Sequence, residues 1–217
     1  MKLKYLATLG LCAFGYVGSA LAVPITFIHT GSGTGSIGST AFTNAFFTIT
    51  ETADTNFRQD CGTGGACFFI NDLSASIKIG EFSYSFQTPT RTFVDQDLAF
   101  VGFGRAGENG QDLLGGPTDV QLANYSMLSS IGPITGSGDL MQFNDPFDPV
   151  LTSGGRLLFD DQSGPFSFQA TVTVVPEPST YLLLIAGLVA VGLRHSKKKV
   201  RTPLSVTGCS PATAARP

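Results

Sequence analysis

The sequence predicts an all-β fold, an antiparallel β-sandwich of jelly-roll type, with a barrel as the alternative. Three observations support this prediction. The body of the chain, residues 23–174, is rich in Gly, Ser, Thr, Asn and Phe and poor in helix formers, which is typical of short strands joined by turns. Apolar and polar residues alternate in several segments. At about 150 residues, the body has the size of one domain with its own core.

The alternation is clearest from residue 74 to 79 and from residue 166 to 174, where every second side chain is apolar. A short helix is expected at residues 121–130. The Gly-Ser-Gly-Thr-Gly segment, residues 31–35, is interpreted as a flexible linker or turn, because it lacks the Lys-Ser/Thr that follows a phosphate-binding loop. The predicted strands are residues 25–28, 42–50, 73–79, 81–87, 97–103, 155–159 and 166–175.

Acidic and basic residues are distributed unevenly along the chain. Residues 23–175 contain five basic and fifteen acidic side chains, a formal charge of −10, whereas the whole chain has a formal charge of −3. The other basic residues lie almost entirely at the two ends. An acidic body repels phosphate groups, so the sequence argues against nucleic acid as a partner. The charge suits a soluble extracellular protein or one that meets cations.

Catalytic residue patterns are nearly absent from the body. Its one histidine, His29, would have to carry any Ser-His-Asp site, and an exposed or strand-end histidine is the simpler interpretation. Closely spaced carboxylates could serve glycosidic chemistry or bind calcium, but none has the spacing of a calcium loop. We interpret them as solvated loop acids, and we expect no catalytic residue, metal site or cofactor. These carboxylates are Asp95, Asp97, Asp145, Asp148, Asp160 and Asp161.

Cys61 and Cys67 are the two cysteines of the body, and five small residues separate them. Export would place both thiols in an oxidising compartment, and the intervening loop is flexible enough to close. A zinc site is disfavoured, because the spacing is not a zinc pattern and the body histidine is remote. The sequence therefore predicts a disulfide.

Residues 1–22 have the three parts of a secretory signal peptide. Two lysines form the positive n-region, and residues 6–17 form an apolar stretch that is short for a spanning helix. Ala20 and Ala22 fit the Ala-x-Ala pattern of the cleavage site. Cleavage there would make Val23 the first residue of the mature protein.

Residues 175–201 have the order of a stop-transfer signal. The segment opens on Pro-Glu-Pro, whose two prolines keep the backbone extended and accessible to an enzyme. An apolar run follows, and we expect residues 181–193 to form one transmembrane helix, although the run is short. A basic cluster comes next and would stay on the cytoplasmic side of the inner membrane. Its members are Arg194, Lys197, Lys198 and Lys199.

The Pro-Glu-Pro motif, the apolar run and the basic cluster, paired with a signal peptide, resemble the PEP-CTERM sorting domain of Gram-negative bacteria. The resemblance covers residues 175–201 and not the body. It implies that an exosortase, a membrane-embedded transpeptidase-like enzyme, recognises Pro176, Glu177 and Pro178 and processes the chain. This chain continues past the basic cluster through residues 202–217, a Pro-, Ala- and Thr-rich tail that we expect to be disordered.

Together, these features predict a non-enzymatic protein that crosses the inner membrane, is anchored there transiently, and then reaches the cell surface or the medium. The resemblance also implies exopolysaccharide as a partner, because such proteins belong to biofilm-forming species. Two alternatives remain open. The body could be a carbohydrate- or calcium-binding β-sandwich module, or, less favoured, a carboxylate-dependent hydrolase.

Overall fold

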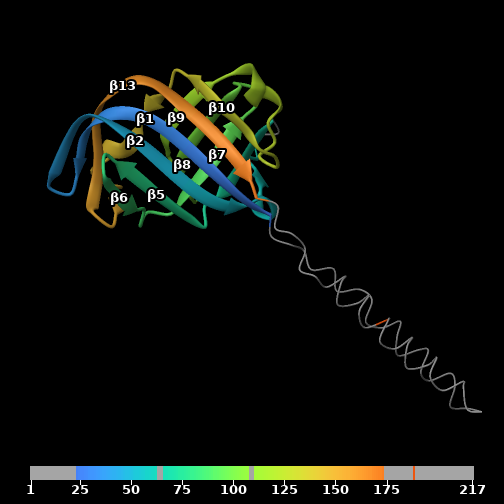
Figure 1. Cartoon of the computed structure of the whole chain (residues 1–217), viewed down its shortest axis with the longest axis horizontal. Coiled ribbons are helices and arrows are strands. Elements are labelled where there is room, and N and C mark those ends of the chain that lie inside the picture. The colour runs from blue at the N-terminus through green and yellow to red at the C-terminus, as the bar shows by residue number, and fades with distance from the viewer. Residues whose placement is uncertain (1–22, 63–65, 108–109, 174–187, 189–217) are drawn as a thin grey trace, which may run out of the picture. The chain divides into compact units, whose positions relative to one another are not determined.

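The computed structural model describes residues 23–62, 66–107, 110–173 and 188. Within these residues, thirteen β-strands and three short 3-10 helices form two antiparallel sheets (Figure 1). The predicted all-β sandwich is therefore confirmed. The chain divides into two compact units, Met1–Val175 and Pro176–Pro217, and every strand that the structure describes belongs to the first unit.

The first sheet, sheet A, has the strand order β10-β13-β1-β2-β5-β6, with β12 also paired to β13. Its centre consists of the long strands β13, β1 and β2, which lie side by side in Figure 1. The strands of sheet A are β1 (Pro24–Ile37), β2 (Thr40–Asp54), β5 (Ser74–Ile79), β6 (Phe82–Ser85), β10 (Ile131–Gly136), β12 (Val150–Thr152) and β13 (Gly155–Val172).

The second sheet, sheet B, has the strand order β11-β9-β8-β7-β4-β3. Its strands are β3 (Gln59–Asp60), β4 (Cys67–Asn71), β7 (Thr90–Asp95), β8 (Phe100–Arg105), β9 (Asp112–Thr118) and β11 (Asp139–Leu140). The 3-10 helices η1 (Thr55–Phe57), η2 (Val120–Asn124) and η3 (Gln142–Asn144) lie in the connections.

The glycine-rich segment from Gly31 to Gly35 is a correction to the sequence analysis. It lies inside β1 and pairs with both β2 and β13. A methyl group on Gly31 would lie 2.7 Å from the ring of Phe166 and 2.8 Å from the ring of Phe47. The prediction of a linker or turn is therefore wrong, because phenylalanine rings fill the space beside Gly31 and Gly33 and the Leu158 backbone fills it beside Gly35.

The predicted helix at residues 121–130 is also wrong in type and length, because only η2 forms there. Leu122, Tyr125 and Met127 are all buried in the core. In an α-helix, Met127 would point about 140° away from Leu122, so one helix face could not bury both. Asp119 caps η2 by accepting a hydrogen bond from the Gln121 amide at 2.8 Å, and the chain then becomes extended.

Two predicted strands, residues 155–159 and 166–175, are parts of the single strand β13, which ends at Val172. The edge strand β6 also approaches β12. The Gln87 amide donates to the Leu151 carbonyl, and the Ser153 amide donates to the Ser85 carbonyl, both at 2.8 Å. Because β12 pairs with β13, this end of sheet A closes into a ring of strands, a barrel-like feature within a two-sheet fold.

The core between the sheets contains two apolar clusters. One gathers around Phe47 and Phe103, and the other around Phe27 and Phe168. His29 lies between them, with its ring centroid 4.9 Å from that of Phe168 and 6.3 Å from that of Phe103. The middle of the sandwich is thus polar, while both ends are apolar.

Candidate functional site

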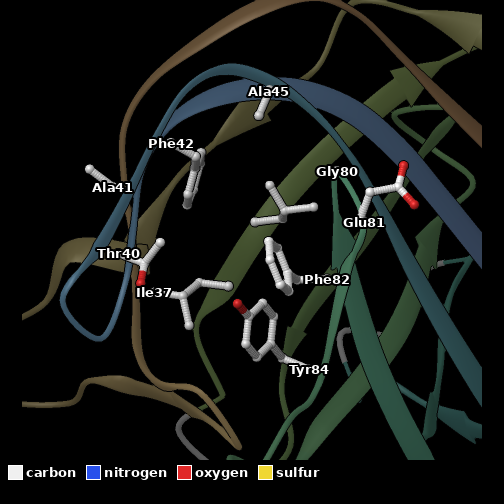
Figure 2. A pocket seen from close by; sticks show the side chains of 10 residues that line it. Ile37, Thr40, Ala41, Phe42, Ala45, Gly80, Glu81, Phe82 and Tyr84 are labelled. Atoms are coloured by element: carbon white, nitrogen blue, oxygen red, sulfur yellow. The ribbon is translucent and has the colours of Figure 1, made fainter.

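An apolar pocket of about 270 Å³ opens at one end of sheet A, between the β1–β2 hairpin and the β5–β6 hairpin (Figure 2). It exists because β2 is much longer than β5. Strand β5 pairs with β2 only from Phe47 to Thr52, so residues 40–46 extend past the end of β5. The overhanging part of β2 and the strand β6 form opposite walls of the pocket.

Three aromatic rings dominate the lining of the pocket. Phe42 comes from β2, and Phe82 and Tyr84 come from β6 (Figure 2). The Phe82 side chain is 67% exposed, so its ring is available to a ligand. The polar groups of the lining are few, and the Glu81 side chain points away from the rings (Figure 2). A concave, mostly carbon surface of this kind binds apolar groups, because binding removes both partners from water.

A second hollow, of about 320 Å³, adjoins the pocket and shares Ala45 and Gly80 with it. Phe46, which is 60% exposed, and Lys78 line this hollow. Lys78 is the single lysine between residues 23 and 175. A positive charge therefore lies beside the aromatic pocket on an otherwise acidic body.

A buried polar cluster lies in the middle of the core. His29 on β1 and Glu51 on β2 are both fully buried, with 3.8 Å between His29 Nε2 and Glu51 Oε1. Thr92, on β7 of the opposite sheet, donates its hydroxyl to Glu51 Oε2. Within the described part of the chain, neither ring nitrogen of His29 has a hydrogen-bond partner. The interpretation of His29 as exposed or at a strand end is wrong.

Burial controls the charge of this cluster. It lowers the pKa of His29 to about 3, so the imidazole is neutral near pH 7. Burial, together with repulsion from Asp72, raises the pKa of Glu51 well above its usual value, against the Thr92 hydrogen bond. Burial likewise raises the pKa of Asp72 to about 7. These are acid–base groups, but His29 and Glu51 have no solvent-accessible surface through which a substrate could reach them.

The loop carboxylates considered for calcium or glycosidic chemistry do not converge. Asp95 accepts a hydrogen bond from the Leu98 amide at 3.0 Å, and Asp145 accepts one from the Phe147 amide at 2.8 Å. Asp148 pairs with Arg105 at 3.0 Å. Among the described residues, no group of three His, Cys, Asp or Glu side chains is placed to hold a metal ion. Asp95 and Asp145 instead stabilise turns, and Asp148 forms an ion pair. Asp160 and Asp161 are exposed but lie within β13, so their interpretation as loop acids is wrong.

The structure contains the predicted disulfide between Cys61 and Cys67, whose Cα atoms are 5.4 Å apart. The Cys61 amide also donates to the Cys67 carbonyl at 3.1 Å, so the bridge joins two neighbouring backbone segments. It closes the connection between β3 and β4 at the edge of sheet B.

Most residues of the two predicted targeting segments lie outside the described residues. This applies to Ala20 and Ala22, to Pro176, Glu177 and Pro178, and to the basic cluster. Val23 is described, and its amide lies 3.3 Å from Asp54 Oδ1. In the predicted transmembrane segment, residues 181–193, only Leu188 is described. Across the described part of the chain, no helix is long and apolar enough to span a bilayer.

Comparison with known proteins identifies the C-terminal segment. Residues 174–198 match the family model of the PEP-CTERM protein-sorting motif. No curated protein and no solved structure matches the chain. The match contains the Pro-Glu-Pro residues and most of the basic cluster, which are the features on which the resemblance rests.

The chain is therefore a β-sandwich protein with a C-terminal sorting signal. More particularly, it is a PEP-CTERM motif-containing protein, an exported protein that an exosortase sorts. The motif implies a transient membrane-anchored state in a Gram-negative bacterium.

Proposed function

We propose that the exported protein is a non-enzymatic component of the cell surface or the extracellular matrix, where it associates with exopolysaccharide. The sorting motif supports delivery to the outside of the cell. The acidic body, with a formal charge of −10 over residues 23–175, suits a protein that stays soluble after release.

One observation carries the non-enzymatic part of the proposal. The acid–base pair of His29 and Glu51 is sealed inside the core at 0% exposure. Because neither side chain has solvent-accessible surface, a polymer substrate cannot reach these groups without unfolding the sandwich. The carboxylates of Asp95 and Asp145, both half-buried, accept hydrogen bonds from backbone amides of their own turns.

The test uses the protein purified from the surface fraction of the producing bacterium and the exopolysaccharide of the same strain. We expect the protein to co-sediment with this polymer and not with dextran, a neutral control. We also expect no new reducing ends during prolonged incubation. Steady release of reducing ends would support the carboxylate hydrolase instead, and absence of co-sedimentation at every ratio would refute the association.

A second experiment tests whether exosortase sorting delivers the protein to the matrix. In a strain without its exosortase, the protein should remain with the membrane fraction, and the matrix should lose it. Equal amounts in the matrix with and without the exosortase would contradict sorting as the route to this location.

A further inference from the structure

The side chain of Phe147 is almost completely exposed to solvent. Phe147 lies on the loop between η3 and β12 and is 95% exposed. Its amide donates to Asp145 Oδ1 at 2.8 Å, which shapes the turn beneath the ring. Phe147 is the most exposed large apolar side chain in the described part of the chain, so its ring is available for contact with a partner.

Two arginine side chains fix the conformation of the loop that carries Phe147. Arg105, which is 4% exposed, lies 3.0 Å from Asp148 Oδ1 and also donates to the Asp148 carbonyl. Arg156 donates to the Asp145 carbonyl at 3.1 Å. The loop is therefore fixed before any partner arrives, so binding through Phe147 loses little conformational entropy.

The pocket described above has the complementary shape and chemistry. At about 270 Å³ it exceeds the cavity of about 150 Å³ that holds a benzene ring in an engineered protein. Its rings, Phe42, Phe82 and Tyr84, would surround an inserted ring in tilted or edge-to-face contacts. Phe147 does not fill the pocket of its own chain, because it is exposed.

Charges beside the two features are also complementary. Asp145 lies two residues from Phe147 and is half-buried, and its carboxylate accepts a hydrogen bond from the Phe147 amide. Lys78 is in the hollow that adjoins the pocket and shares Ala45 and Gly80 with it. An aromatic ring with a neighbouring carboxylate would thus meet the ammonium group of Lys78 beside the pocket, while the carboxylate of Glu81 in the lining points away from the rings (Figure 2).

We propose that Phe147 of one copy of this protein inserts into the aromatic pocket of a second copy. The two surfaces are different parts of the molecule, so the contact is head-to-tail. Each copy in such a pair keeps one free Phe147 and one free pocket, and further copies can add. Association therefore continues into open chains or closed rings, which goes beyond the proposed function and would build an extended assembly at the cell surface.

A sugar is the main competing occupant of the pocket. Sugar recognition needs several convergent hydrogen-bonding groups as well as a ring to stack on. The lining offers mainly the Thr40 and Tyr84 hydroxyls, and Glu81 points away (Figure 2). An apolar side chain needs no such groups, so the structure favours Phe147 over a sugar.

The experiment measures the mass distribution of the exported protein by sedimentation velocity over a wide concentration series. The wild type should form species that grow with concentration. Phe147→Ala and Phe82→Ala should each weaken association about 30-fold, the loss typical of one hot-spot residue. Both side chains are largely exposed, so neither change should unfold the protein. Phe57→Ala removes another ring, 60% exposed, and is the matched control that should leave association unchanged.

A mixture of the two variants gives the sharpest result. The Phe147→Ala variant retains an intact pocket, and the Phe82→Ala variant retains the inserting Phe147 ring. One copy of each should therefore form a dimer that cannot grow further. Lys78→Glu should weaken the wild-type association, most clearly at low salt.

Three results would overturn the proposal. The wild type could stay monomeric at every concentration. It could assemble equally well after Phe147→Ala. Alternatively, oligosaccharides from the producer's polymer could occupy the pocket, as shown by chemical-shift changes at Phe82 and Tyr84, while the protein stays monomeric. The last result would leave the proposed association with exopolysaccharide intact and would assign the pocket to it.

Discussion

Replacing Gly35 by alanine should destabilise the sandwich strongly, contrary to what a linker position would show. In a flexible linker, Gly→Ala stabilises a protein by about 0.4–1 kcal/mol, because it restricts the unfolded chain. In the structure, Gly35 lies in β1, and a methyl group there would be 2.0 Å from the Leu158 carbonyl oxygen. That oxygen belongs to β13, so it can move only if the β1–β13 pairing is disrupted.

The structure also ranks related substitutions. At Gly31 the clashing atoms are ring carbons of Phe166 and Phe47, at 2.7 and 2.8 Å, and rings can shift. Overpacking of this kind costs about 1–3 kcal/mol, so Gly31→Ala should lose roughly 1–2 kcal/mol after the gain from the unfolded chain. Gly35→Ala should lose about 3 kcal/mol or more, because backbone must move. For a domain of this size, that corresponds to a fall in Tm of roughly 6–12 °C.

Thermal unfolding of the three variants Gly35→Ala, Gly31→Ala and Ser32→Ala, followed by circular dichroism, measures this order. Ser32 is the control, because it lies on the outward side of β1 between the glycines and should change stability by less than about 0.5 kcal/mol. A Tm for Gly35→Ala equal to or above that of the wild type would show that the segment is a loop, and the placement of β1 would be wrong.

Three further predictions concern other parts of the chain. Asp72→Asn should gain stability relative to the wild type as the pH rises from about 4 to about 7. Burial raises the pKa of Asp72 to about 7, so the wild type loses the stabilising effect of the proton on this carboxyl group over that range. Chemical denaturation at several pH values measures the difference in stability, and a constant difference between the two proteins would contradict the prediction. Replacing Cys61 and Cys67 by serine should lower the free energy of unfolding by roughly 2 kcal/mol, because the loop that the disulfide closes is short. Urea unfolding measures this loss. A loss above about 5 kcal/mol would mean that the disulfide is needed for the stability of the whole fold. Replacing Pro176 and Pro178 by alanine should leave export intact but trap a membrane-bound precursor, which mass spectrometry of cell fractions would show; surface protein with the wild-type mass would refute the role of these prolines.

Alternation along the chain located the strands of sheet A better than those of sheet B, and burial explains the difference. In β5, Ile77 and Ile79 face the core, while Lys78 between them faces solvent. In β7, which the sequence did not predict, the residues from Thr92 to Val94 are all buried, so both faces of the strand are covered and no alternation remains. The same holds for most of β9, whose Gly-Gly-Pro sequence reads as a turn. Periodicity can report a strand only when its two faces meet different surroundings.

The pocket could not be predicted from sequence. Phe42 and Phe82 are forty residues apart, and they line one pocket because β2 overhangs the β5–β6 hairpin. Strand pairing sets the length of that overhang. The exposure of Phe147 is equally hidden in sequence, since a phenylalanine between two Asp-Pro steps could as well have been buried.

By itself, the sequence determined the features that depend on local order along the chain. The sorting motif, the strand-rich composition and the pairing of Cys61 with Cys67 can be read from neighbouring residues, because an enzyme or a short loop acts on a continuous segment. Only the tertiary structure decided that His29 and Thr92 both meet Glu51 in a sealed core, and that Gly31 and Gly33 of β1 lie against phenylalanine rings. Those contacts join residues that are distant in sequence, and their environment is set by how two sheets pack together, which no local pattern records.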